Sequence, residues 1–344
     1  MLAELLRTHR DAARSPEQRR AVNAILSCRT LTRGGHLYRC SPCAKMEFAY
    51  HSCHHRACPN CGALQAADWL EQRKLRLLPV PYFLLTFTIP EELRALFKLE
   101  PKFCYDLLFT ATSQSLRDVA LSKSGGEPAA LGVLHTWSRQ LVFHPHIHYI
   151  VPGGFLSQNR LRWIRLKDPQ FLLPEKVLSR RARNLFRAAL QARPELLAKV
   201  PAVVWKKEWI VNTQAVGSGE HALKYLARYV QRTALSSQHI FKEENGRVTF
   251  QYRQSDTGAW KLLTLETREF LRRFLQHVLP SGFHRVRYYG WWSPAAKTKW
   301  ERILALLDWS AGTRPQKRAP WVKTCPGCGK AMQRIGLLPR GPPS

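Results

Sequence analysis

Acidic side chains are scarce in this sequence: 24 Asp and Glu stand against 54 Lys and Arg, giving a formal net charge of +30 over 344 residues. A surface with that charge repels itself unless counter-charge is bound, so we expect an extended polyanion as partner, with nucleic acid foremost. Long apolar runs are lacking too. No stretch of about 18 apolar residues occurs that would span a bilayer, and the amino-terminal segment has no apolar core typical of a signal peptide. We therefore expect a cytoplasmic protein without a membrane partner.

Cysteine is present but, in a reducing compartment, is not expected to form disulfides. Six of the nine cysteines form CxxC pairs: Cys40/Cys43, Cys58/Cys61 and Cys325/Cys328. The first two pairs are separated by a short segment poor in aliphatic side chains, a pattern typical of a tetrahedral structural zinc site. We predict that Cys40, Cys43, Cys58 and Cys61 bind one Zn²⁺.

Further potential ligands leave ligand exchange or a second zinc open, and these are Cys28, His36, His51, Cys53, His54 and His55. The pair Cys325/Cys328 is half a site. It has three interpretations: it joins spare ligands of the first module, it holds a metal across a dimer, or it binds nothing. The single Cys104 falls in an apolar helical pattern and is interpreted as a core residue.

Strand and helix patterns alternate after the cysteine-rich segment, which favours an α+β fold. Strands are expected at 82–89, 132–137, 146–151, 202–211 and 283–289, with β-hairpins at 244–246 and 256–258, and helices at 102–121, 175–192, 220–235 and 266–278. Short helices in residues 1–27 are expected to pack on the segment that follows. The sequence predicts three regions: a helical and zinc-binding module at 1–75, a catalytic domain at 76–308, and a loosely ordered basic tail with a CxxC at 309–344.

The segment 134–151 concentrates four of the thirteen histidines. On a strand, alternate side chains share a face, so His146 and His148 project together while Ile147 and Tyr149 face a core. Neutral imidazole is a good ligand for a divalent ion. His135, on the preceding strand, is our choice for the third ligand. Gln140 and His144 are the alternatives.

Two tyrosines, Tyr225 and Tyr229, lie one turn apart on the helix predicted at 220–235. Their helix has a buried stripe of Ala222, Leu226 and Val230 on one side and Lys224, Arg228 and Arg232 on the other. The tyrosines thus lie between a core and three cations expected to bind DNA phosphate. A phenol with a pKa near 10 is a weak nucleophile at neutral pH, so a metal ion or cations must polarise the phosphate that it attacks.

The set CRTLTRGGHLYRCSPC, HSCHHRACPNC, GVLHTWSRQ, HPHIHYIVPGG and YLARYVQRTALS, in this order, resembles the two-tyrosine rolling-circle transposases of the insertion-sequence ninety-one family. These belong to the HUH endonuclease superfamily and carry an amino-terminal transposase zinc-binding domain. The resemblance implies a ferredoxin-like or RRM-like antiparallel sheet with the HUH pair at its centre and the catalytic helix beside it. One departure is Ala57, where family members usually have a histidine.

The resemblance also implies the reaction. Tyr225 and Tyr229 would attack single-stranded DNA beside Mg²⁺ or Mn²⁺ held by His146, His148 and His135, and would form a 5′-phosphotyrosine ester that conserves the bond energy. No GxxxxGK[ST] loop is present to bind ATP, which agrees with such a transfer. Expected partners are single-stranded transposon ends and target DNA, and homo-oligomers are compatible with this activity.

Two other interpretations remain open from the sequence. A replication initiator or conjugative relaxase of the HUH superfamily would share the nicking chemistry, although the zinc module favours the transposase. In a non-catalytic zinc-dependent DNA-binding regulator, the tyrosines and histidines would be structural. Metal-dependent nicking of single-stranded oligonucleotides separates the enzymes from the regulator.

Overall fold

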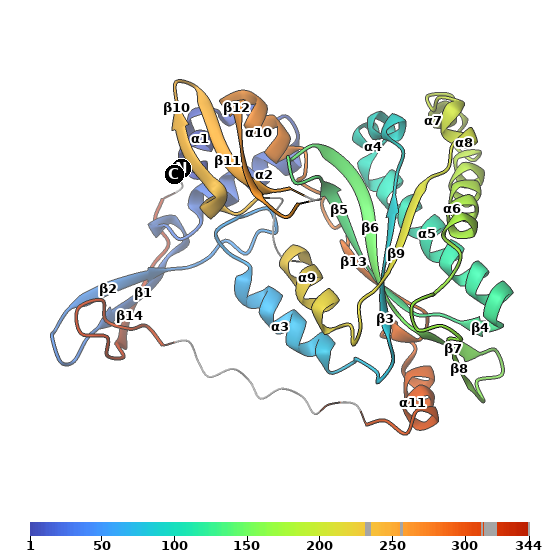
Figure 1. Ribbon diagram of the computed structural model, residues 1–344. Helices are drawn as coiled ribbons and strands as arrows, with labels where there is room; N and C mark the ends of the chain where they lie inside the picture. Colours follow the sequence, from blue (N-terminus) through green and yellow to red (C-terminus); the bar gives the residue numbers. More distant parts are fainter. Residues whose placement is uncertain (231–234, 255–256, 311, 313–321, 343–344) are drawn as a thin grey trace.

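A five-stranded antiparallel sheet forms the centre of the fold (Figure 1). The computed structural model describes all residues except 231–234, 255–256, 311, 313–321 and 343–344, and at 228–229 it describes the backbone alone. Strand order in the sheet is β13-β5-β6-β3-β9. The bounds are β3 (Tyr82–Thr88), β5 (Ala130–Trp137), β6 (Phe143–Pro152), β9 (Ile210–Ala215) and β13 (Val286–Tyr289). The expected α+β fold is confirmed, with the histidine-bearing strand β6 in the middle position.

One face of this sheet is covered by α4 (Arg94–Leu99), α5 (Pro101–Ser124) and α6 (Glu175–Leu190). The strands bury alternate side chains against these helices, such as Phe83, Leu85 and Phe87 of β3. Helix α6 contributes buried apolar residues at every fourth position, namely Leu178, Ala182, Phe186 and Leu190. Among the described residues, this layer is the largest apolar core.

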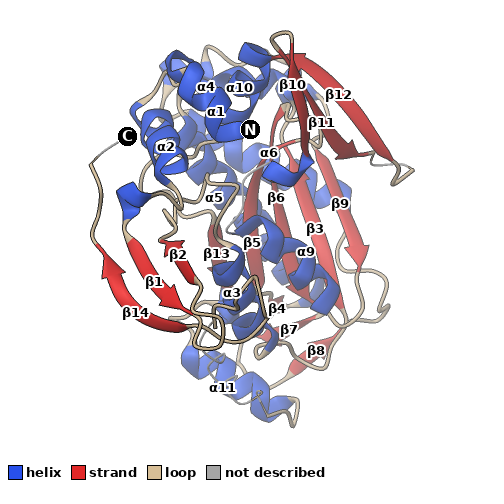
Figure 2. Ribbon diagram, turned by 90° about the vertical axis from the view of Figure 1, so that its left-hand side faces the viewer, coloured by secondary structure: helices blue, strands red, loops and turns tan. Residues whose placement is uncertain are grey.

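The opposite face carries α3 (Ala63–Lys74) and α9 (Glu220–Val230), which lie in front of the sheet in Figure 2. Their apolar side chains join sheet residues of the other parity, including Val133 and Ile150, in a second core. Alternate side chains of β5 and β6 therefore belong to different cores. The histidines lie on the same face of the sheet as Val133 and Ile150.

A second three-stranded sheet, β10-β11-β12, stands beside the main one with α10 (Thr267–Leu275) on it. Its strands are β10 (Ile240–Glu244), β11 (Arg247–Arg253) and β12 (Trp260–Glu266), which confirms both predicted hairpins. The amino-terminal helices α1 (Leu2–Thr8) and α2 (Pro16–Ser27) bury Leu6 and Ile25 with Phe250 and Phe270. The first helices thus pack on residues more than 200 positions away as well as on the cysteines that follow them.

The third sheet joins the two ends of the chain. It has the order β14-β1-β2, with β1 (Gly35–Arg39), β2 (Met46–Tyr50) and β14 (Gln333–Leu338). The prediction of a loosely ordered tail at 309–344 is therefore wrong for its last part, because β14 forms an antiparallel ladder with β1. A six-residue strand finds its hydrogen-bond partners only in a distant segment, and local composition does not reveal such pairing.

The remaining elements are shorter. A small sheet combines β4 (Gly126–Glu127), β7 (Gly154–Ser157) and β8 (Trp163–Arg165), and the remaining helices are α7 (Pro194–Leu197), α8 (Val203–Lys206) and α11 (Lys297–Leu306). The strand expected at 202–211 is wrong in its first half, which is α8, whereas β9 begins at Ile210. A short apolar run such as Val203-Val204-Trp205 fits one helical turn as well as a strand.

Candidate metal centre and tyrosine helix

The histidines of β6 are arranged by strand parity, as predicted. Ile147 and Tyr149 are fully buried in the core under α5, while His146 and His148 emerge on the opposite face and are partly exposed. The ring centroids of His146 and His148 are 4.8 Å apart. Two imidazoles therefore converge on one point above the middle of the sheet.

His135 completes a group of three. It lies on β5 directly opposite His146, and its ring centroid is 5.2 Å from that of His146 and 4.6 Å from that of His148. One ring nitrogen of each histidine lies within 4.8 Å of the others. The structure thus brings together the three histidines chosen from the sequence.

The two alternatives for the third ligand lie outside this group. Gln140 donates a hydrogen bond to the Tyr252 hydroxyl at 3.1 Å, in the turn beyond β5. His144 Nδ1 is 3.4 Å from Arg94 Nη2, on the far side of Pro145. Neither belongs to the group of three, although the ring centroid of His144 is 5.3 Å from that of His146.

Hydrogen bonds orient two of the rings. Nδ1 of His146 lies 2.6 Å from the backbone oxygen of His144 and donates to it, and Nδ1 of His148 lies 2.7 Å from Thr86 Oγ1 on β3. Such partners fix the tautomer and leave Nε2 for a metal ion. Burial lowers the pKa of His146 to about 4 and holds those of His135 and His148 well below the ordinary value. All three rings are neutral at pH 7, the form that coordinates metal.

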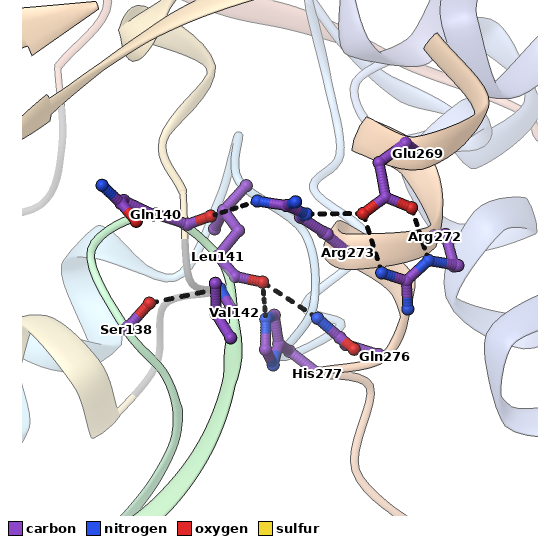
Figure 3. Close-up of polar contacts among 9 residues, drawn as sticks. All are labelled: Ser138, Gln140, Leu141, Val142, Glu269, Arg272, Arg273, Gln276 and His277. Carbon is purple, nitrogen blue, oxygen red and sulfur yellow. Dashed lines mark hydrogen bonds and ion pairs between the residues drawn. The ribbon is translucent and has the colours of Figure 1, made fainter. Parts of the chain in front are cut away.

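The turn that joins β5 to β6 is held by the end of α10 (Figure 3). The backbone oxygen of Leu141 accepts hydrogen bonds from Gln276 Nε2 at 2.9 Å and His277 Nε2 at 3.2 Å. Arg273 Nη1 donates to the backbone oxygen of Gln140 at 3.4 Å, and Glu269 holds this guanidinium in place. These contacts fix the hairpin that carries all three histidines.

His277 connects both sides of that hairpin. Its Nε2–H points to Leu141 in the turn, and its Nδ1 lies 3.2 Å from Thr136 Oγ1 on β5, next to His135. Burial lowers the pKa of His277 to about 3, so the ring is neutral and donates from one nitrogen only. Sequence reasoning missed this residue, because a lone histidine after an amphipathic helix carries no signal of its role.

Helix α9 places a tyrosine beside the histidines. The ring of Tyr225 is perpendicular to that of His148, with the centroids 5.8 Å apart, and 37% of its surface is exposed. The predicted buried stripe of Ala222, Leu226 and Val230 is confirmed and anchors the helix on the sheet. Tyr225 is thereby held between the core and the histidines.

The other predicted residues of this helix are only partly described. Tyr229 lies one turn after Tyr225 on α9, but the side chains of Tyr229 and Arg228 lie outside the described part of the structure, as does the whole of Arg232. Lys224 is exposed and forms an ion pair with Glu220 at 2.9 Å. A phosphate group would therefore compete with Glu220 for this ammonium group.

The cysteines form two groups of four rather than the one predicted. Cys58 and Cys61 lie with Cys28 and Cys53, whereas Cys40 and Cys43 lie with Cys325 and Cys328. The predicted set of Cys40, Cys43, Cys58 and Cys61 is therefore wrong as a single site. Its two CxxC pairs are separated in space because β1 and β2 extend Cys40 and Cys43 away from the core that contains Cys58.

The first group has the geometry of a closed tetrahedral site. Sγ of Cys53 is 3.7 Å from Sγ of Cys61, and the backbone N–H of Cys53 donates to Cys28 Sγ at 3.5 Å. Hydrogen bonds among the four thiols lower the pKa of Cys28 and raise those of Cys58 and Cys61. Four thiolates would fill the shell of a Zn²⁺ ion and leave no position for a substrate.

The spare histidines lie outside both groups. Nε2 of His36 on β1 and Nε2 of His51, just after β2, are 3.3 Å apart, and His54 Nδ1 is 2.7 Å from Gln65 Nε2. Among the described residues, no helix is both long and apolar enough to cross a membrane.

Comparisons with known proteins agree with this arrangement. Residues 129–299, which include the three histidines and α9, match a family described as "Putative transposase", and residues 2–89 match the "Transposase zinc-binding domain". The "Putative transposase y4qJ" of Sinorhizobium fredii is 39% identical over 84% of this chain and 79% of its own length. The "Transposase for insertion sequence element IS801" of Pseudomonas savastanoi pv. phaseolicola is 28% identical over 78% of this chain and 68% of its own length. No solved structure is significantly similar to the chain.

Proposed function

Because this chain belongs to the transposases of the insertion-sequence ninety-one family, we propose that it cuts and rejoins single-stranded DNA through a 5′-phosphotyrosine intermediate in rolling-circle transposition. The proposal rests on the position of Tyr225, whose ring lies against the imidazole of His148. His148 is one of the group of three imidazoles. A candidate nucleophile and a candidate metal site thus lie side by side on one face of the sheet.

The donor set fits a divalent ion. His135, His146 and His148 are neutral, so none of the positive charge of the ion is cancelled, and three ligands leave coordination positions for phosphate oxygens. Bound there, Mg²⁺ or Mn²⁺ would polarise the phosphodiester and stabilise the charge that develops on it. We expect moderate affinity, since imidazole is a borderline ligand for such hard ions.

In the proposed reaction, the phenol oxygen of Tyr225 attacks the phosphorus and loses its proton. The bond from phosphorus to the 3′-oxygen breaks, and that oxygen takes up a proton as the free 3′-hydroxyl. The ester between tyrosine and the 5′-phosphate keeps the bond energy, so a 3′-hydroxyl from another strand reverses the step without ATP. Tyr229, one turn further along α9, is the second nucleophile in this scheme and would permit a second strand transfer.

The first group of four cysteines has a structural role in this proposal and takes no part in the reaction. We propose that Cys28, Cys53, Cys58 and Cys61 bind a structural Zn²⁺, which supports the joint between α2 and the start of α3. Three of these cysteines are buried in the core formed by α1, α2 and α10. Since α3 packs against α9, this zinc site is linked through a helix pair to the element that carries the tyrosines.

The test is a cleavage assay on single-stranded oligonucleotides from both flanks of the encoding gene. The proposal expects Mg²⁺- or Mn²⁺-dependent nicks at a defined position, a free 3′-hydroxyl and protein on the 5′-phosphate. A regulator would bind these strands without cutting them. A replication initiator or relaxase of the HUH superfamily would share the nicking chemistry, so nicking separates the enzymes from the regulator and not from one another. The match to the transposase zinc-binding domain favours the transposase among these candidates.

A further inference from the structure

The second group of four cysteines joins segments from opposite ends of the chain. Cys40 and Cys43 lie in the turn between β1 and β2, and Cys325 and Cys328 lie before β14. The match to the transposase zinc-binding domain ends at residue 89, so it includes only half of this group. The proposed strand-transfer reaction assigns no role to these four side chains.

Their distances fit a tetrahedral ion. Sγ of Cys40 is 3.4 Å from Sγ of Cys328, Sγ of Cys43 is 3.4 Å from Sγ of Cys325, and Sγ of Cys43 is 3.9 Å from Sγ of Cys328. Four sulfurs at the usual Zn–S length of about 2.3 Å lie roughly 3.8 Å from one another. The sulfurs are therefore already spaced as around a zinc ion, and none is in a disulfide.

The two halves of the site have the same local structure. The backbone N–H of Cys40 donates to the oxygen of Lys45 at 2.9 Å, and that of Cys325 donates to the oxygen of Lys330 at 2.8 Å. In each case a CxxC pair is closed by a hydrogen bond from its first cysteine to the residue five positions later. The backbone N–H of Gly327 also donates to Cys325 Sγ at 3.4 Å. Two matching turns that face each other are typical of a four-cysteine zinc ribbon.

Apolar packing around this group is slight. Cys40 and Cys325 are buried, but among the described residues only Met332 and the half-buried Tyr38 complete their cluster. A three-stranded sheet with so small a core does not hold its edge strand by burial alone. A metal cross-link accounts for the ordered fold at this place.

The carboxyl-terminal segment makes further specific contacts with the amino-terminal module. Gly34, with φ +68°, faces the backbone of residue 338, where a Cβ atom would lie 2.7 Å from the carbonyl oxygen. The backbone N–H of Gly341 donates to the oxygen of Leu31 at 3.0 Å, and Thr32 Oγ1 donates to the oxygen of Pro342 at 3.3 Å. The ladder of β14 on β1 thus continues into contacts that reach almost to the end of the chain.

We propose that Cys40, Cys43, Cys325 and Cys328 bind a second structural Zn²⁺, which fastens the carboxyl-terminal segment to the amino-terminal module. The ion links residue 43 to residue 325 and so closes the chain into a loop that contains the histidines and α9. Binding releases the thiol protons and leaves the site with two net negative charges. Lys45 and Lys323, each two residues from a cysteine of the group, lie 3.9 and 3.8 Å from the carboxylate of Glu47.

The test is zinc content per chain, measured on the purified full-length protein, with no DNA cleavage involved. The variants are Cys40→Ser with Cys43→Ser, Cys325→Ser with Cys328→Ser, and all four together. We expect each double variant to lose one zinc and the quadruple variant to lose the same one only. Cys28→Ser with Cys53→Ser should remove the other zinc, and Cys104→Ala should remove none. Additive losses, an unchanged zinc content in either double variant, or iron in place of zinc would overturn the proposal.

A second measurement avoids cysteine substitutions and so holds even where those variants fold poorly. A specific protease site is placed between Gly312 and Val322, and the cleaved chain is passed through a sizing column. The carboxyl-terminal fragment is expected to stay with the body and to leave when a zinc chelator is added. Release without a chelator contradicts the site. A metal-linked dimer of uncleaved chains would contradict its placement within one chain.

Discussion

The ring of Tyr225 on α9 stands perpendicular to the imidazole of His148 on β6, and their centroids are 5.8 Å apart. This contact joins a strand to a helix. Alternation of side chains along β6 places the histidines on one face of the sheet, and the buried stripe of α9 determines which side of the helix faces them. The three histidines would hold a divalent ion that polarises a phosphodiester, and Tyr225 presents its phenol beside them.

Removal of either imidazole of β6 should abolish cleavage. In His146→Ala or His148→Ala, only two ligands remain, and we expect the nicking rate to fall by about a hundredfold or more, because the metal no longer stabilises the developing charge. DNA affinity should change little, since it depends on the cationic surface. His144→Ala is the matched control: it removes a neighbouring imidazole outside the group and leaves the backbone oxygen that accepts from His146. Cleavage at the normal rate in both ligand variants would exclude the histidines from the mechanism.

Thr86 should act by positioning a ligand. Its hydroxyl lies 2.7 Å from His148 Nδ1, and loss of such a partner typically weakens metal binding by about 10- to 100-fold. For Thr86→Ala we expect the metal concentration at half-maximal cleavage to rise by that factor, with the rate restored at saturating metal. Thr86→Ser should behave like the wild type. A loss of rate that metal does not restore would point to a different role.

His277 should make the fold sensitive to acid. Its pKa is lowered by burial from 6.5 to about 3, so between these values the unfolded chain takes up a proton that the folded chain does not. The stability is fully present above pH 6.5 and falls as the pH drops toward 3. We expect wild-type protein to lose about 2 kcal/mol more than His277→Gln between pH 7 and pH 5, as measured by urea unfolding. Equal losses in the two proteins would show that this ring is not buried in its neutral form.

A basic hollow of about 450 Å³ lies beside α2, and its lining includes Arg10, Arg20, Arg33 and Arg340 but no acidic residue. Such a surface fits DNA phosphate, and neutralisation of phosphates makes affinity fall steeply with salt, by about a thousandfold between roughly 50 and 200 mM for six or more contacts. Arg20→Gln with Arg340→Gln should weaken binding at low salt and flatten this dependence.

Arg181→Gln provides the control for the hollow, because Arg181 lies on α6, outside the lining. It is ion-paired with Asp118, as Arg20 is with Glu17, so each variant breaks one ion pair. The DNA affinity of Arg181→Gln should fall with salt as steeply as that of the wild-type protein. If the double variant shows the same slope as this control, the hollow does not contact phosphate. Deletion of 309–344 is a poor substitute for these variants, since it also removes Cys325 and Cys328.

Local patterns in the sequence predicted what local geometry determines. Alternation along β6 placed His146 and His148 on one face, the hairpin to β5 brought His135 beside them, and helical spacing predicted the buried stripe of α9. Each of these follows from a period of two or 3.6 residues and from short connections.

Long-range pairing determined the parts that the sequence did not predict. The grouping of the cysteines depends on the ladder between β1 and β14, which are almost 300 residues apart. The hydrogen bonds from Gln276 and His277 to the backbone oxygen of Leu141 depend on how α10 packs on a separate sheet. Neither contact has a periodic signal, because both result from the tertiary fold.

The central claim is that the tyrosines of α9 attack DNA, and trapping of the covalent product tests it most directly. Tyr→Phe removes the reacting hydroxyl but keeps the ring and its packing, so a loss cannot be attributed to a cavity. Wild-type protein, a labelled single-stranded end and Mn²⁺ are combined and separated on a denaturing gel. We predict that the double variant Tyr225→Phe with Tyr229→Phe forms no covalent protein–DNA adduct, whereas each single variant still nicks but loses strand transfer. An adduct at the normal yield from the double variant would contradict the account, because the nucleophile would then lie elsewhere.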